Sequence, residues 1–146
     1  MLDTIYSQIG VGVTLTVVGF AFLKGDEPER VGGGACALGL LASLLLQDDT
    51  RLTGPQWGLM AVDVVMLVVY GALAWKSRRA WPVWAGALQT LIVMTHVASV
   101  VDLRPPLAAF YVVLNAASYG ILLALALGVL GAWNERRAFG LSHSVR

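Results

Sequence analysis

Charged side chains are scarce in this sequence. Asp, Glu, Lys and Arg make up 13% of its 146 residues, whereas about 25% is typical of a soluble domain. Hydrophobic residues make up 58%. They fall in blocks of about 20, the length that an α-helix needs to cross the ~30 Å hydrocarbon core of a membrane. The composition therefore argues against an ordinary soluble domain and predicts an integral membrane protein.

Cysteine and catalytic motifs are also scarce. Cys36 is the single cysteine, so an intrachain disulfide is impossible, and no metal-type spacing surrounds it. The sequence has no phosphate-binding glycine loop, no G-x-S-x-G nucleophile elbow and no H-E-x-x-H zinc motif. The polar stretches between the apolar blocks are too short for a catalytic domain. We predict that the chain is not an enzyme, and nothing in it supports nucleic-acid binding.

The apolar blocks predict an all-α bundle of five transmembrane helices. They lack the two-residue alternation of membrane β-strands, and the prolines fall in loops or at helix starts, where a missing N–H costs little. The expected spans are 5–23, 31–47, 57–75, 82–101 and 107–133, followed by a short basic tail at 134–146. The second span is short and rich in glycine, so a re-entrant segment is the alternative there.

Lysine and arginine residues predict the orientation of the bundle, because they collect in cytoplasmic loops. With the N-terminus outside and the C-terminus inside, the outer side holds only Arg51 and Arg104. The inner side then holds Lys24, Arg30, Lys76, Arg78, Arg79, Arg136, Arg137 and Arg146. No basic residue precedes the first apolar block, unlike in a cleaved signal peptide. We therefore expect a multi-pass protein of a bacterial inner membrane.

Aromatic and acidic residues give two further expectations at the inner side. Trp75, Trp81, Trp84 and Trp133 should lie near the inner interface, since their amphipathic rings favour that depth. Three acidic residues follow Lys24 in a short loop, and we interpret them as a solvated turn: Asp26, Glu27 and Glu29.

Asp63 and His96 are ionisable residues that fall deep within apolar blocks. If 57–75 and 82–101 form an antiparallel hairpin, these two side chains lie at nearly the same depth, in the outer part of the membrane. An ionised carboxylate in hydrocarbon costs about 2.5–3.5 kcal/mol on insertion scales. Asp63 should therefore face protein or water, and it should either pair with His96 or be protonated.

Other polar residues are expected near this pair. Tyr70 lies seven residues from Asp63, and Gln89 lies seven from His96, so each shares a helix face with its neighbour. The two faces should then meet in a second polar layer. Three further residues fall at the outer depth of the pair and suggest a polar pocket open to the outside: Ser43, Tyr111 and Asn115.

The Asp63–His96 pair has three possible roles. The first is a structural hydrogen bond between helices. The second is a proton relay or ion-coupling site, because histidine changes charge near neutral pH and carboxylate–histidine chains handle protons in membranes. The third is a haem or metal site at His96, which one histidine and one carboxylate would serve poorly. We predict no cofactor and no metal.

Small residues recur at every fourth position of the last apolar block. This small-residue stripe comprises Ala116, Gly120, Ala124, Gly128 and Ala132. Such a stripe lets another helix approach closely, which drives association in membranes. The expected partner is the first span, the second span or a second copy of the chain.

Two functions follow from these features. The first is a non-catalytic assembly or accessory subunit, which associates with itself or joins a larger membrane complex. The alternative is a small oligomeric ion channel or proton-coupled transporter that uses Asp63 and His96. Either way, the expected partners are the lipid bilayer and either further copies of the chain or other membrane subunits.

Overall fold

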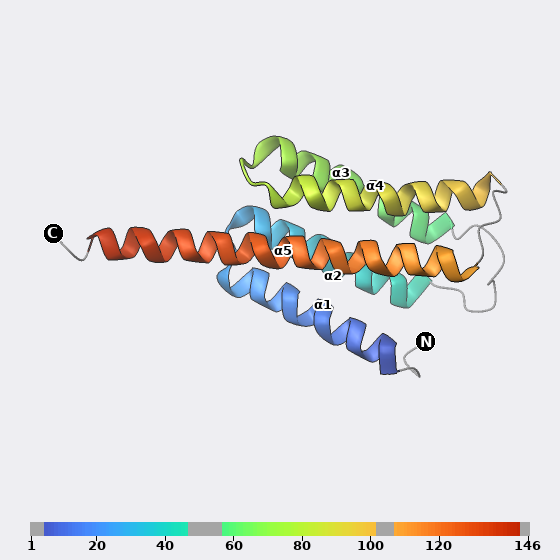
Figure 1. The fold of residues 1–146 in the computed structure, drawn as a ribbon, viewed down its shortest axis with the longest axis horizontal. Coiled ribbons are helices and arrows are strands. Elements are labelled where there is room, and N and C mark those ends of the chain that lie inside the picture. Colours follow the sequence, from blue (N-terminus) through green and yellow to red (C-terminus); the bar gives the residue numbers. More distant parts are fainter. Residues whose placement is uncertain (1–4, 47–56, 102–106, 144–146) are drawn as a thin grey trace.

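The computed structural model describes residues 5–46, 57–101 and 107–143, and in these ranges the elements are all α-helices (Figure 1). The all-helical prediction is therefore confirmed. In chain order the helices are α1 (Ile5–Lys24), α2 (Glu27–Leu46), α3 (Trp57–Lys76), α4 (Trp81–Val100) and α5 (Leu107–His143). They form an up-and-down bundle in which α5 contacts α1, α2 and α4. The start of α1 and the end of α5 lie at opposite ends (Figure 1).

Four of the helices are long and apolar enough to cross a membrane: α2, α3, α4 and α5. The apolar part of α1, Gln8–Lys24, is shorter. Large hydrophobic side chains such as Leu45, Val68 and Leu123 are exposed on the surface of the bundle. This surface suits hydrocarbon better than water, because a soluble protein rarely exposes extended apolar patches. The structure is thus consistent with a multi-pass membrane protein.

Two helices differ in extent from the expected spans. α2 begins at Glu27 rather than at residue 31 and runs to Leu46 without a break, which gives it a length of about 30 Å at 1.5 Å per residue. α5 continues beyond residue 133 to His143, so most of the expected tail is helical. Glu135, Arg136 and Ala138 favour this continuation, because all three residue types have high helix propensity.

Gly25 and Asp26 alone connect α1 to α2. The N–H of Gly25 donates to the carbonyl of Ala21 over 2.9 Å, and a Cβ atom at Gly25 would collide with that same carbonyl oxygen. The turn therefore requires glycine. The carboxylate of Glu29 then accepts a hydrogen bond from the N–H of Asp26 over 3.0 Å, as in the capping box that begins many helices. We call the end of the bundle with this turn the inner end.

The two glycines of the small-residue stripe pack against α4, a helix that was not among the expected partners. Association with a second copy of the chain stays a prediction. A Cβ atom at Gly128 would collide with the indole ring of Trp81, and one at Gly120 would lie 2.8 Å from Cδ1 of Leu88. Trp81 and Leu88 are seven residues apart on α4, so they present one helix face to α5. Bulky side chains from the helix that precedes α5 in sequence thus fill the gaps above the glycines. In the rest of the stripe, Ala124 and Ala132 are buried and Ala116 is exposed.

Candidate polar site between α3 and α4

Asp63 and His96 meet across the antiparallel α3–α4 pair. Nε2 of His96 lies 3.0 Å from Oδ2 of Asp63, within the range of an N–H···O hydrogen bond. The structure thus brings together the two side chains that the hairpin register predicts at one depth. Each belongs to a helix of 20 residues, and both lie in the half of the helix that is farther from the α3–α4 loop.

Gln89 is the third member of this polar site. Its Nε2 donates to Oδ1 of Asp63 over 2.9 Å and to the backbone carbonyl of Asp63 over 3.1 Å. Both carboxylate oxygens of Asp63 therefore have a hydrogen-bond partner on α4. Gln89 and His96 are seven residues apart, so one face of α4 supplies both partners. We call Asp63, Gln89 and His96 the polar triad.

The polar triad is largely enclosed by protein. Gln89 and His96 are buried, and Asp63 is partly buried. Phe110 of α5 packs edge-to-face on the imidazole, with ring centroids 5.9 Å apart. Oε1 of Gln89 is buried and has no hydrogen-bond partner among the described residues. Buried polar atoms are nearly always hydrogen-bonded, so this oxygen offers the triad one further position for a donor.

Tyr70 does not form the expected second layer with Gln89. Its hydroxyl lies 3.3 Å from Sγ of Cys36 on α2, and its ring packs edge-to-face on Trp81 with centroids 6.4 Å apart. Gln89 bonds to Asp63 instead, because a carboxylate is a stronger acceptor than a phenol, above all in a medium of low dielectric. Tyr70 therefore joins α2, α3 and α4 in the core and is not part of the triad.

Ser43, Tyr111 and Asn115 do not complete an outer polar pocket. Tyr111 and Asn115 are exposed on α5, and Ser43 is partly buried on α2. Within the described ranges, none of them hydrogen-bonds to the triad. Tyr111 packs on Phe110, with ring centroids 5.7 Å apart. Equal depth was a poor guide here, because depth does not determine the direction of a side chain around its helix.

The triad combines the carboxylate of Asp63, a proton acceptor, with the imidazole of His96, which can accept and release a proton. A carboxylate beside an imidazole is suited to hold or transfer a proton without placing a bare charge in hydrocarbon. Asp63 and His96 provide two ligand-type side chains, and no third His, Cys, Asp or Glu in the described ranges joins them. The absence of a haem or metal stays a prediction.

A second polar cluster, which sequence reasoning missed, lies at the inner end. Glu29 is fully buried rather than part of a solvated turn. Its Oε1 accepts a hydrogen bond from the indole Nε1 of Trp81 over 2.8 Å and lies 3.7 Å from Nε of Arg79. Trp81, at the start of α4, is itself buried against protein. The N–H of a buried indole needs an acceptor, and Glu29 supplies it.

Arg79 and Arg136 extend this cluster to the turn and to α5. Nη2 of Arg79 lies 2.9 Å from Asp26, and Nη1 lies 3.1 Å from Glu135. Nη1 of Arg136 lies 2.6 Å from Asp26, and its Nη2 donates to the carbonyl of Lys24. We call Asp26, Glu29, Arg79, Glu135 and Arg136 the inner charge cluster. The spacing of Asp26 and Glu29, which is that of a capping box, was the one sequence signal for it.

Comparisons with protein-family models, curated proteins and solved structures found no match for this chain. Its function is therefore argued from the geometry of its own residues.

Proposed function

We propose that this chain is a small proton-coupled transporter or proton channel, and that the Asp63–His96 pair binds and releases the proton. The 3.0 Å contact between Nε2 of His96 and Oδ2 of Asp63 carries the proposal. Intramembrane ionisable groups are costly to insert, so they are retained mainly where they serve an ion or proton pathway. Gln89 holds Asp63 in place for the imidazole through one hydrogen bond to its carboxylate and one to its backbone carbonyl.

The proposal includes five membrane crossings in a bacterial inner membrane, with the N-terminus outside and the C-terminus inside. Two observations support this topology. α1 is itself a helix of 20 residues, about 30 Å long. The inner end holds the α1–α2 turn, the α3–α4 loop and the polar part of α5, as the ion pairs among Asp26, Arg79 and Arg136 require. Most lysines and arginines of the chain belong to these segments, as the positive-inside rule demands.

Proton flux into liposomes tests this function. Purified protein is reconstituted into vesicles that contain a pH-sensitive dye, and a potassium diffusion potential drives proton entry. We expect flux with the wild type and none with Asp63→Asn or His96→Gln. Each change preserves the approximate size of the side chain but removes one titratable group from the pair.

Tyr70→Phe is the matched control, because it removes a buried hydroxyl from the same hairpin without altering the triad. It should leave flux unchanged. Thermal unfolding in detergent confirms that each variant is folded. Absence of flux with the wild type, or full flux with Asp63→Asn, would exclude the proposal.

The assembly or accessory subunit is a second candidate, and one observation favours it. The carboxylates of Asp63 and Glu29 are satisfied within the chain: Asp63 by Gln89 and His96, and Glu29 by Trp81 and Asp26. Carboxylates that are fully paired within one chain also suit a purely structural role. Purification in mild detergent distinguishes the two candidates. A stoichiometric partner or a defined homo-oligomer, together with no proton flux, would favour the subunit.

A further inference from the structure

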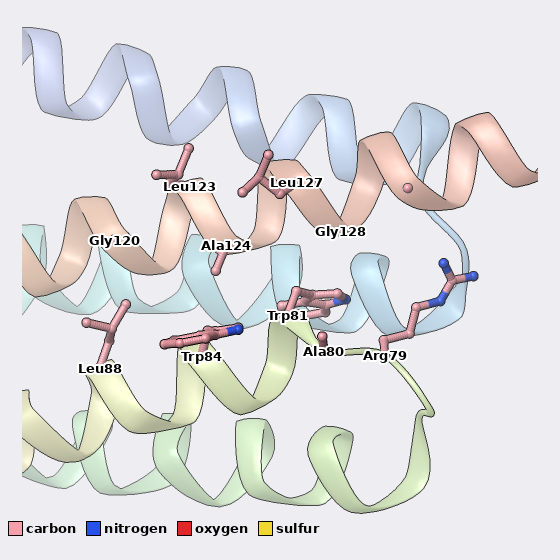
Figure 2. A pocket seen from close by; sticks show the side chains of 11 residues that line it. Arg79, Ala80, Trp81, Trp84, Leu88, Gly120, Leu123, Ala124, Leu127 and Gly128 are labelled. Atoms are coloured by element: carbon pink, nitrogen blue, oxygen red, sulfur yellow. The ribbon is translucent and has the colours of Figure 1, made fainter.

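A groove of about 570 Å³ lies between α4 and α5 on the outside of the bundle (Figure 2). Its walls include Trp81, Trp84, Leu88, Leu123, Leu127 and Gly131, and Arg79 lies at its inner end. The volume is in the range of small-molecule sites. Trp84 is 67% exposed, and Leu123 and Leu127 are also exposed. In a membrane this groove would therefore open directly to lipid.

The shape of the groove favours a thin, flexible occupant over another helix. The glycines that would admit a helix are already covered, Gly128 by Trp81 and Gly120 by Leu88. A helix with its side chains is about 10 Å across, and the projecting rings and leucines of the walls would hold it away from the floor. An acyl chain can follow such an apolar floor and replace the van der Waals contacts that an unfilled groove would lose.

The charges at the inner end favour an anionic headgroup. In the inner charge cluster three acidic residues are paired with two arginines, so the cluster has one excess negative charge. The four basic residues named next outnumber it. Lys24 and Arg137 lie over the ring of Trp133. Lys76 and Arg78 are exposed, and neither forms an ion pair with a described residue. Arg78 directly precedes the groove residues Arg79 and Ala80 in the α3–α4 loop.

We propose that the α4–α5 groove binds one acyl chain of an anionic phospholipid, whose headgroup is held by Arg78 at the inner end. The apolar walls provide affinity for the chain. The guanidinium of Arg78 selects the headgroup, because a basic residue near the membrane surface attracts anionic lipid. This proposal is independent of the polar triad, which lies on the α3 side of α4.

Quenching of tryptophan fluorescence by bromine-labelled lipids tests it. Trp84 lies in the groove, whereas Trp75 is 94% exposed on α3 and lines no part of the groove. The chain has five tryptophans, so Trp57 and Trp133 are first replaced by Phe in all variants. In this background Trp75→Phe retains Trp84 as the groove reporter, and Trp84→Phe retains Trp75 as the control reporter. Both variants keep Trp81, whose signal is measured in the double variant Trp75→Phe/Trp84→Phe and subtracted. Bromine-labelled phosphatidylglycerol, titrated into phosphatidylcholine vesicles, should quench Trp75→Phe at a several-fold lower mole fraction than Trp84→Phe. Bromine-labelled phosphatidylcholine should quench the two variants alike.

Two matched pairs of variants separate the chain from the headgroup. Gly131→Phe should fill the groove and abolish the selective quenching, whereas Gly71→Phe on α3 should not, although a Cβ meets no atom within 4 Å at either glycine. Arg78→Gln should raise the mole fraction needed for half-maximal quenching, whereas Arg30→Gln on α2 should not. Identical curves for both reporters and both lipids would overturn the proposal. The proposal would also be overturned if cross-linking showed a dimer of the wild type that is lost in Gly131→Phe, because a second copy would then occupy the groove.

Discussion

Arg79 contacts two glutamates that differ greatly in exposure. Glu29 is fully buried, and its Oε1 also accepts the hydrogen bond from Trp81, whereas the side chain of Glu135 is 60% exposed. A buried carboxylate of this kind stabilises the fold mainly because its removal leaves a buried donor without a partner. An exposed pair contributes little, because water screens both charges.

We therefore predict unequal effects of removing these two glutamates. Glu29→Ala should lower the free energy of unfolding by about 1–3 kcal/mol, because the buried N–H of Trp81 loses its acceptor. Glu135→Ala should lower it by less than ~1 kcal/mol, and added salt should reduce that loss further. Chemical unfolding in detergent at two salt concentrations measures both. Equal losses in the two variants would contradict the burial of Glu29 as the cause.

At this scale the sequence predicted the triad better than the inner charge cluster. Asp63 and His96 stand alone in apolar runs, and helix periodicity together with one hairpin turn places them at one depth. Glu29 lies among other charged residues in a loop, where solvent exposure is the ordinary expectation. Its burial depends on Trp81, 52 residues later in the chain, and no local pattern reports such a contact.

The contact between α4 and α5 rests on glycines with very different surroundings. A Cβ atom at Gly128 would collide with Trp81, whereas one at Gly131 would meet no atom within 4 Å. The two residues are three positions apart on the same helix, yet only the first lies beneath a bulky side chain. Helix propensity alone would favour alanine at both by about 1 kcal/mol.

We therefore predict opposite outcomes for alanine at these glycines. Gly128→Ala should destabilise the protein by about 1–3 kcal/mol, because the indole ring must move in a packed core. Gly131→Ala should be neutral or stabilising by up to about 1 kcal/mol. Unfolding in detergent measures the difference, and a destabilised Gly131→Ala beside an unaffected Gly128→Ala would show that the packing is different.

The helices themselves could be predicted, but their neighbours could not. Apolar run length located all five elements to within a few residues, except where polar helix formers continue α5. The small-residue stripe correctly indicated close packing, but any of several helices could have filled it. The choice of α4 depends on the size of Trp81 and Leu88 and on their spacing, which become informative only when two helices are aligned in three dimensions.

At the scale of the whole molecule, the described ranges hold five helices, and the start of α1 and the end of α5 lie at opposite ends (Figure 1). The connections between helices are short where they are described: two residues join α1 to α2, and residues 77–80 join α3 to α4. Each of these pairs is therefore a tight antiparallel hairpin, whose two ends return to the same side of the bundle.

We predict that the two termini lie on opposite sides of the membrane. A reporter that is active only in the periplasm should be active at the N-terminus and inactive at the C-terminus. A cytoplasmic fluorescent reporter should give the converse result, because the basic segments collect at the C-terminal side. Activity of one reporter at both termini would exclude five crossings.

Trp81 also limits the order in which the bundle can be completed. Its ring contacts Gly32 of α2 and Tyr70 of α3, which the ribosome has already made when α4 emerges. Gly128 belongs to α5, so it contacts the ring only after α5 has been made. A nascent chain that stops before this last helix therefore leaves one face of the indole uncovered. The packing around Trp81 is therefore complete only after α5 has joined the bundle.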